Sequence, residues 1–277
     1  MSGERDHKFE SMRHIMFDFG DSGPLAKRAQ LHPEVRSIES VYEQLNKGNP
    51  EYKEWAQSAG ISIRDGKLVG DFMQLSAIGR YYPKLERALQ YLKSKPGKSF
   101  LYFNTVNTYG VAFIGDVLKA NGLIEIGSPP QRDTLCYQCK VPYSMHQSDH
   151  AFIPYTFFKI SSAERIDYQA ALKQFNNPLN NSVHLVVGSK KTIQGINLIG
   201  VNNVYVMSLP YNISNLIQVM GRAIRNKSHQ FLPEAQRFVD IHILVTAMPE
   251  AAHAESLSDQ LLTREHQDYI DKLKEHR

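Results

Sequence analysis

Two arginines spaced three residues apart are the side chains best suited to chemistry in this sequence. They occur in the pattern Gln218-x-x-Gly221-Arg222-x-x-Arg225, within the apolar segment 213–225, which we expect to be a helix. Residues three or four apart share a helix face, and Gly221 would let a neighbouring backbone approach closely. Two parallel guanidinium groups can bind a polyphosphate through planar, bidentate hydrogen bonds. The alternative is a solvated helix face, which the apolar character of the remaining segment disfavours.

A second group of residues could bind a metal ion. Its spacing is C-x2-C-x6-H-x3-H, and its members are Cys136, Cys139, His146 and His150. Two thiolates and two imidazoles suit tetrahedral Zn²⁺ with no open position, so the ion would be structural. One alternative is a free cysteine pair with surface histidines. Another is a redox pair, which is disfavoured because Pro142 follows so closely. The sequence therefore predicts a structural zinc ion in an irregular insert, residues 127–155.

The charges of the chain are unevenly distributed. The net charge is only +4, yet no acidic residue occurs between Tyr168 and Pro233, a stretch that contains six lysines and arginines. A basic region without acids suits a polyanion such as nucleic acid or nucleotide phosphate. The alternative is a chance lack of acids in a buried α/β core.

Alternating strands and helices must position these residues. The expected strands are 99–106, 123–126, 156–160, 183–188, 203–209 and 237–245, and the expected helices are 84–93, 111–120, 163–175 and 213–225. Such alternation predicts an α/β fold with a parallel sheet covered by helices on both faces. We expect three parts: a mixed, helical extension over 1–75 with a hairpin at 61–69, a lobe over 76–248, and a charged C-terminal helix over 249–277.

Composition excludes several classes of protein. The chain has 277 residues, of which 42% are hydrophobic, and only two cysteines. It can therefore bury a large core, and it is neither a disulfide scaffold nor disordered over most of its length. Polar residues interrupt its longest uncharged stretch, and its N-terminus is too charged for a secretory signal. We expect an intracellular protein without a membrane partner.

Three segments resemble conserved motifs of the superfamily 2 helicases. QVMGRAIR (218–225) resembles motif VI, residues 188–198 resemble motif V, and LYFNTV (101–106) resembles motif IV, all in the second RecA-like lobe. With its flanks, the segment 210–237 is similar to the helicase-like NTPases of large cytoplasmic DNA viruses. Their poxvirus members include the early transcription factor small subunit and nucleoside triphosphate phosphohydrolase I. The resemblance covers residues 67–275 and implies a RecA-like fold.

This resemblance implies a role for individual residues. ATP with Mg²⁺ would bind between two lobes, held mainly by the first, with Arg222 and Arg225 as arginine fingers. Gln218 would lie near the γ-phosphate or the attacking water, and Gly195 near the ribose. Gln194 replaces an acid that is common in motif V, so its nucleotide contact would differ. The implied nucleic-acid-facing positions are Asn104, Thr105, Ser189, Lys190, Lys191 and Thr192.

The nucleotide-binding motifs of a first lobe are missing from the sequence. Gly97-Lys98-Ser99 is not a Walker A loop, because it precedes a strand and lacks the upstream glycine, and no Asp-Glu pair follows an apolar strand. We therefore expect the C-terminal half of a helicase, inactive alone. Its partners would be the first lobe, single- or double-stranded nucleic acid (DNA in preference to RNA), and RNA polymerase or other transcription factors. It would act in viral transcription, in host cytoplasm or virion. The alternative is a non-enzymatic nucleic-acid or partner-binding module with the same fold.

Overall fold

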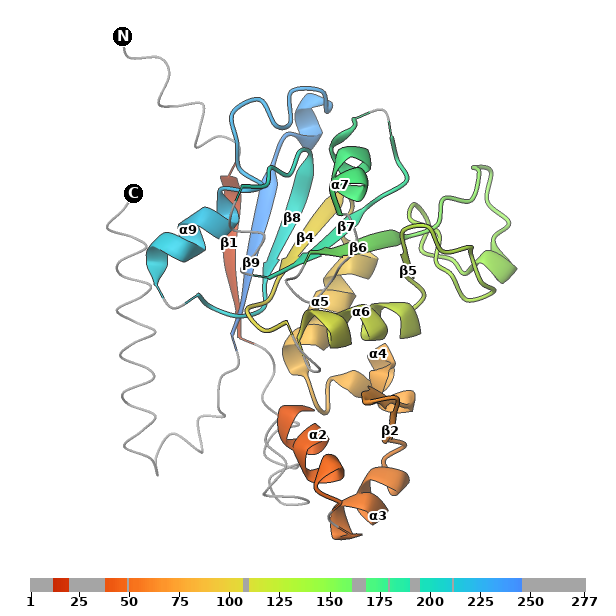
Figure 1. The fold of residues 1–277 in the computed structure, drawn as a ribbon. Coiled ribbons are helices and arrows are strands. Elements are labelled where there is room, and N and C mark those ends of the chain that lie inside the picture. Colours follow the sequence, from red (N-terminus) through yellow and green to blue (C-terminus); the bar gives the residue numbers. More distant parts are fainter. Residues whose placement is uncertain are drawn as a thin grey trace.

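The computed structural model describes residues 12–19, 38–48, 50–106, 110–160, 168–178, 180–189, 195–210 and 212–245. Its centre is a seven-stranded sheet in the order β1-β9-β8-β4-β7-β6-β5, in which all neighbouring strands are parallel (Figure 1). The strands are β1 (Met12–Phe19), β4 (Lys98–Tyr102), β5 (Ile124–Glu125), β6 (Thr156–Ile160), β7 (Leu185–Gly188), β8 (Val201–Val206) and β9 (Val239–Val245). The sheet is the frame on which every candidate residue is placed.

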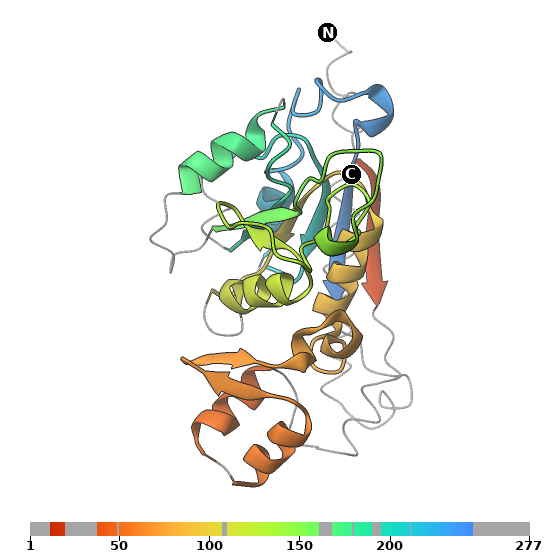
Figure 2. The same cartoon turned by 90° about the vertical axis from the view of Figure 1, so that its right-hand side faces the viewer.

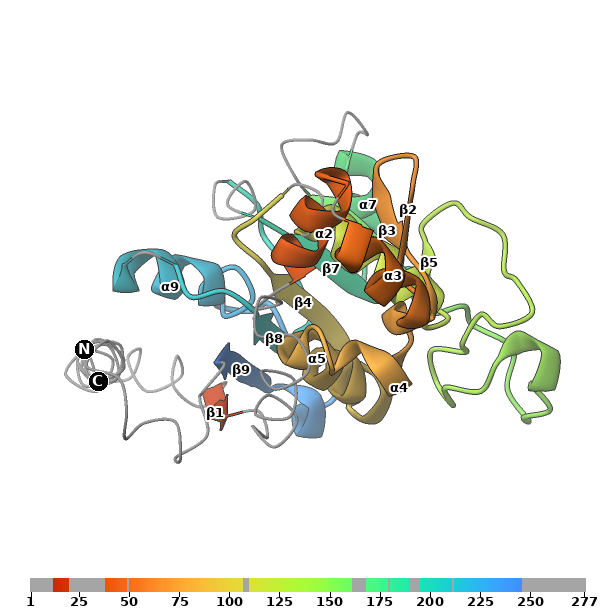
Figure 3. The same ribbon diagram turned by 90° about the horizontal axis from the view of Figure 1, so that it is seen from below.

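Helices cover both faces of this sheet, as a parallel sheet requires. Helices α5 (Pro83–Ser94) and α6 (Val111–Ala120) pack on one face, and α7 (Tyr168–Asn176) and α9 (Ile213–Met220) on the other (Figure 3). Side chains of β4, β7 and β8 alternate between two separate cores. Leu101, Leu185 and Tyr205 belong to the core under α5 and α6, and Phe100, Val186 and Val204 belong to the other. All six are fully buried, and burying one such aliphatic side chain stabilises the fold by about 1.5–3 kcal/mol.

A smaller unit lies at the carboxyl ends of the strands. It contains α2 (Ile38–Asn46), α3 (Pro50–Ser58), the antiparallel hairpin β2 (Ser62–Arg64) and β3 (Lys67–Val69), the 3₁₀ turn Asp71–Met73 and α4 (Leu75–Ile78). In Figure 2 the arrowheads of β1 and β9 point toward the end of the lobe where this unit lies. The hairpin turns at Asp65 and Gly66, whose φ values are 49° and 70°, a conformation that Asp-Gly adopts readily.

Polar and aromatic contacts join this unit to α6. The Asn121 amide, at the end of α6, accepts a hydrogen bond from the Leu75 N–H (2.8 Å) and donates to the carbonyls of Met73 (2.9 Å) and Val117 (2.8 Å). Beside it, the rings of Phe72 and Phe113 stack with their centroids 6.1 Å apart. Asn121 is 7% exposed, so these backbone groups have little access to water as a substitute partner.

The observed elements confirm the α/β prediction and correct some boundaries. The predicted helix 111–120, strand 156–160 and 61–69 hairpin are all present. The predicted helix 213–225 is wrong at its end, because α9 stops at Met220. Strand β4 ends at Tyr102, earlier than predicted, and the strand predicted at 203–209 is 201–206. Strand β1, at the edge beside β9, was not anticipated.

The predicted C-terminal helix, 249–277, lies outside the described residues. Helix α7 begins at Tyr168, and the first five residues of the helix predicted at 163–175 also lie outside them. In the described part of the chain, no helix has both the length and the apolar surface needed to cross a membrane.

Replacing Asn121 tests the junction between α6 and the smaller unit. Asn121→Ala leaves the Leu75 N–H and the Met73 carbonyl without their buried partner, at a cost of about 1–3 kcal/mol for each group. The free energy of unfolding, measured by urea denaturation, should fall accordingly. Ser94→Ala, which removes an exposed side-chain hydrogen bond at the end of α5, is the control. Equal losses in the two variants would contradict a special role for Asn121.

Candidate functional site

Arg222 joins two segments that are distant in the sequence. Its guanidinium Nη1 donates to the carbonyl of Ile196 (3.3 Å), and its own carbonyl accepts from the N–H of Leu198 (3.0 Å). Residues 195–199 lie on the connection from β7 to β8, whereas Arg222 follows α9. The two segments that carry the predicted nucleotide-contacting residues therefore lie side by side.

Helix α9 presents one buried and one exposed face. The Asn212 side chain caps its first turn by accepting from the Asn215 N–H (2.8 Å), which satisfies a backbone donor that the helix leaves unpaired. The apolar face, with Leu216, Val219 and Met220, is buried in the core. Gln218 lies on the exposed face. The helix thus fixes the position of the turn that carries the two arginines.

The two arginines differ in their surroundings. Arg222 is half-buried, and Arg225 is exposed, with its Nε donating to the Gly221 carbonyl (3.4 Å). Burial lowers the pKa of Arg222, and the like charge of Arg225 lowers it further. The two positive charges therefore repel each other, and an anion that binds both guanidinium groups would relieve this repulsion.

Two expectations about this segment were wrong. Arg222 lies in the turn that follows the helix, Arg225 lies beyond that turn, and the two share no regular helix face. The helix ends at Met220 because the next N–H groups bond three residues back, Arg222 to Val219 and Ala223 to Met220. Beyond the helix, the N–H of Leu198 takes the Arg222 carbonyl. No other element of the described residues approaches Gly221 closely either. The nearest atoms to a Cβ placed there belong to α9 itself, the carbonyl oxygens of Ile217 and Gln218.

The predicted nucleic-acid and nucleotide positions lie at strand ends. The Asn104 amide, just beyond β4, accepts from the Tyr102 hydroxyl (2.6 Å) and donates to the Leu209 carbonyl (3.0 Å), so it bridges β4 and β8. Ser189, just beyond β7, is buried, with its hydroxyl 3.5 Å from the Ile160 carbonyl. Gly195 has φ 79°, a conformation that favours glycine.

Thr105 follows Asn104, and its carbonyl accepts from the N–H of Val111 (3.0 Å). The remaining predicted positions lie outside the described residues: Lys190, Lys191, Thr192 and Gln194. The described residues on either side of them are Ser189, just beyond β7, and Gly195.

The predicted metal-binding residues come together in the insert. One ligand atom from each of Cys136, Cys139, His146 and His150 lies within 4.8 Å of all the others. The Cys136 Sγ is 3.4 Å from the His150 Nε2, which is 3.3 Å from the His146 Nε2. Cys136 is fully buried, and the other three are half-buried. The donor set is that of a tetrahedral structural site in which the protein fills all four positions.

The turn between the cysteines favours the thiolate. Lys140 donates its N–H to the Cys136 carbonyl (2.9 Å) and adopts φ 61°, which closes the turn. Burial alone would raise the pKa of Cys136, but hydrogen bonds from the backbone of Cys139 and Ile153 and from the His150 side chain lower it to about 6. Thiolate, not thiol, is the form that coordinates a metal.

Two neighbours of the cysteines contact the lobe, which we did not predict from the sequence. The Tyr137 ring stacks on the ring of the buried His184, just before β7, with centroids 3.6 Å apart and an interplanar angle of 24°. The Lys140 Nζ lies 4.0 Å from the centroid of the Tyr155 ring and 4.5 Å from that of Tyr137. Burial lowers the pKa of His184 to about 3, so this imidazole is neutral. Only the aromatic character of the insert hinted at these contacts.

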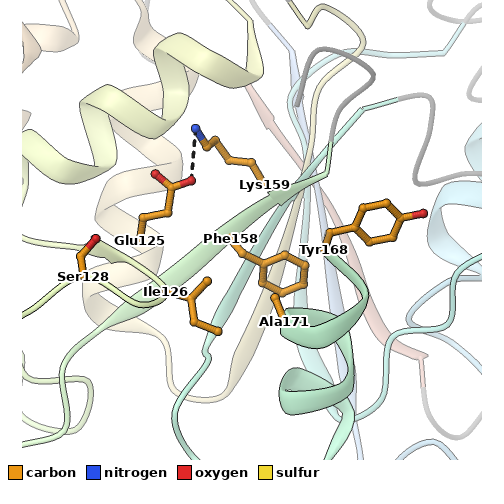
Figure 4. A pocket seen from close by; sticks show the side chains of 7 residues that line it. All are labelled: Glu125, Ile126, Ser128, Phe158, Lys159, Tyr168 and Ala171. Atoms are coloured by element: carbon orange, nitrogen blue, oxygen red, sulfur yellow. Dashed lines mark ion pairs between the residues drawn. The ribbon is translucent and has the colours of Figure 1, made fainter. Parts of the chain in front are cut away.

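A separate cavity of about 150 Å³ lies at the β5 edge of the sheet (Figure 4). Its polar wall is an ion pair between Lys159 and Glu125 (3.3 Å), and Glu125 also pairs with Lys119 of α6 (2.9 Å). Its apolar wall includes Phe158 and Ala171. None of the predicted site residues lines this cavity, and its charges are already paired, so it is not part of the site.

Comparison with known proteins identifies the region around the site. Residues 138–227 match the model of the helicase conserved C-terminal domain. The chain is 33% identical over 197 residues to the early transcription factor large subunit homolog of African swine fever virus (strain Badajoz 1971 Vero-adapted), covering 68% of this chain and 17% of that protein. It is 26% identical over 174 residues to a putative ATP-dependent RNA helicase of Acanthamoeba polyphaga mimivirus, covering 54% of this chain and 15% of that protein.

A third relative is nucleoside triphosphatase I of Heliothis armigera entomopoxvirus, which is 31% identical over 94 residues, or 33% of this chain and 15% of that protein. The chain thus spans about a sixth of the length of these relatives. The expected resemblance to viral helicase-like NTPases is confirmed, although the African swine fever virus relative is named for a large subunit and not a small one.

Proposed function

Because this chain contains a helicase conserved C-terminal domain and is homologous to viral helicase-like transcription factors and NTPases, we propose that it is the second motor lobe of an ATP-dependent superfamily 2 helicase or translocase. Residues 76–248 would form this lobe, with 127–155 as its insert, 1–75 as an extension and 249–277 as a terminal helix. The observation that carries the proposal is the pair of contacts through which Arg222 holds the motif V and motif VI segments together.

In this proposal ATP with Mg²⁺ lies between two lobes. A first lobe supplies the Walker motifs, which this sequence lacks, so the chain alone would not hydrolyse ATP. Arg222 and Arg225 offset charge that develops on the γ-phosphate, and Gln218 lies close to that phosphate or to the attacking water. Gly195 and Gln194 lie at the nucleotide. Burial lowers the pKa of Arg222 and the like charge of Arg225 lowers it further, and an anion bound to both guanidinium groups would offset that repulsion.

Nucleic acid would run across the carboxyl ends of the strands. Loops that leave β4 and β7 gather there, at Asn104 and Ser189, and the acid-free stretch 168–233 supplies the cations. Because the Asn104 and Ser189 side chains already contact carbonyls of the lobe, their backbone groups and the lysines of the β7–β8 connection would make most contacts. We propose a role in viral transcription, in the host cytoplasm or virion, with RNA polymerase or another transcription factor as a further partner.

Loss of either arginine should abolish most turnover. On the protein that carries both lobes, Arg222→Ala or Arg225→Ala should lower kcat by roughly 10³–10⁵-fold, the range for an arginine finger. The measurement is steady-state ATPase activity with nucleic acid present. Arg222→Lys keeps the charge but loses the bidentate fork, so it should also be strongly impaired.

Lys173→Ala, which removes an exposed cation of α7 in the same acid-free stretch, is the matched control and should retain full activity. Normal turnover of either arginine variant would remove that residue from the catalytic machinery. A protein that binds nucleic acid but never turns over ATP would instead be the non-enzymatic module.

Binding of nucleic acid by the lobe should be weak and strongly dependent on salt. Each phosphate neutralised by a lysine releases counterions, so the slope of log K against log salt concentration scales with the number of contacts. Lys190→Ala and Lys191→Ala should each reduce this slope by about 1 without changing sequence preference. Fluorescence anisotropy with labelled single-stranded DNA measures it, with Lys93→Ala on α5 as the control. A slope unchanged by both substitutions would show that the nucleic acid binds elsewhere.

We further propose that the Cys/His cluster of the insert holds one structural zinc ion. In a tetrahedral site with Zn–S near 2.3 Å and Zn–N near 2.0 Å, neighbouring ligand atoms are about 3.3–3.8 Å apart. The S–N and N–N distances of 3.4 and 3.3 Å have this size. Four protein ligands leave no open position, so the ion takes no part in catalysis.

Elemental analysis tests this site directly. Protein purified without chelator should contain one zinc ion per chain, and Cys139→Ser should lose most of it because three ligands bind Zn²⁺ more weakly. His266→Ala, outside the cluster, is the control. Zinc-free wild-type protein with both thiols open to titration would contradict the assignment.

A further inference from the structure

The residues that contact the lobe alternate with the residues that would bind the metal. Tyr137 lies between Cys136 and Cys139, and Lys140 follows Cys139. Since the cysteine turn fixes the backbone of all these positions, a ligand of the cysteines also fixes the two side chains that reach the sheet. We propose that the metal ion seats the insert on the amino ends of β4, β6 and β7 by holding the Tyr137 ring against His184. This inference rests on the metal site proposed above.

Tyr137 reaches two strands at once. Its ring stacks on His184, the residue before β7, and a backbone hydrogen bond from Gly97, just before β4, reaches its hydroxyl. Its own N–H donates to the carbonyl of Ile153 (2.7 Å). The side chain therefore spans from the insert to the two central strands. A displaced cysteine turn would withdraw this ring from both.

Tyr155 supports the same contact from β6. It precedes that strand, is 1% exposed, and meets the Tyr137 ring edge-on at 5.2 Å. Its hydroxyl donates to the Leu92 carbonyl of α5 (3.3 Å). The Lys140 ammonium lies over both tyrosine rings and donates to the Tyr137 carbonyl (2.6 Å), so it closes the cluster on the side of the cysteine turn.

A metal ion would join the two halves of the cluster directly. Backbone hydrogen bonds close the turn 136–141, from Cys136 N–H to Val141 and from Lys140 N–H to Cys136. The segment 146–150 meets that turn where the Cys136 Sγ lies 3.4 Å from the His150 Nε2, and the His146 ring packs edge-on against Phe152 with centroids 5.3 Å apart. One ion bound by both segments would add four coordinate bonds to these contacts and so supply further ordering energy.

The seating acts at the opposite end of the sheet from the proposed chemistry. Gly97, Tyr155 and His184 precede their strands, whereas the proposed nucleotide and nucleic-acid positions follow theirs. Zinc loss should therefore change the packing of the insert without removing any group from the site.

Nuclear magnetic resonance of histidine rings in the full chain measures the seating. The His184 ring protons should be shifted upfield by the Tyr137 ring in zinc-loaded protein, and assigned by comparison with His184→Gln. Removing zinc with a chelator should move the resonance toward that of an unstacked imidazole, and adding Zn²⁺ should restore it. Tyr137→Leu should lose the shift while retaining one zinc per chain. Tyr143→Leu, at the exposed tip of the insert, should keep both and is the control.

The outcomes separate the two proposals. A His184 resonance that is the same with and without bound zinc overturns the seating but leaves the metal site intact. Failure to bind zinc overturns both. Circular dichroism distinguishes local from global effects: a chelated protein that keeps its sheet and loses the shift supports the seating. Loss of the whole sheet on chelation would contradict it, because the ion would then hold the fold itself.

Discussion

The direction of the strands is the constraint on which the rest of this structure depends. Seven neighbouring strands are parallel, so each connection must return from the carboxyl end of one strand to the amino end of the next. Every segment that leaves a strand therefore gathers at one edge, and every segment that enters a strand gathers at the other. The first edge collects Asn104 and Ser189, whereas the second collects Gly97, Tyr155 and His184. Topology alone therefore separates the positions of the proposed chemistry from those that contact the insert.

The connection from β7 to β8 also contacts the turn after α9. The Ile196 carbonyl accepts a hydrogen bond from the Arg222 guanidinium, and the Leu198 N–H donates to the Arg222 carbonyl. The position of Arg222 thus depends on the burial of α9 and on the path of this connection together. A change in the backbone of either segment would be transmitted to the other.

The sequence predicts the fold well where a periodic pattern of apolar residues specifies a helix or strand. The segments 111–120 and 156–160 are strongly patterned, and their bounds agree with α6 and β6. It fails at the end of α9, because Ala223 and Ile224 continue the apolar pattern past the last helical residue. Gly221, the C-cap, was the local sign of this stop, and beyond it the N–H of Leu198 takes the Arg222 carbonyl in a tertiary contact. Strand β1 pairs only with β9, far along the chain, so no local pattern shows that it joins this sheet.

The candidate site was predictable in residue types but not in surroundings. The spacing of Cys136, Cys139, His146 and His150 suffices to predict their convergence, because the ligand set carries its own geometry. Nothing in the spacing shows that Tyr137 stacks on His184 or that the Asn104 amide already binds the Leu209 carbonyl. Such contacts depend on which strands become neighbours.

Strand β5, at one edge of the sheet, is very short. It has two residues, and Pro129 and Pro130, which lack an N–H, follow soon after. A strand from another molecule would therefore find few backbone groups to pair with at this edge of the sheet. This lowers the tendency of the protein to aggregate at high concentration.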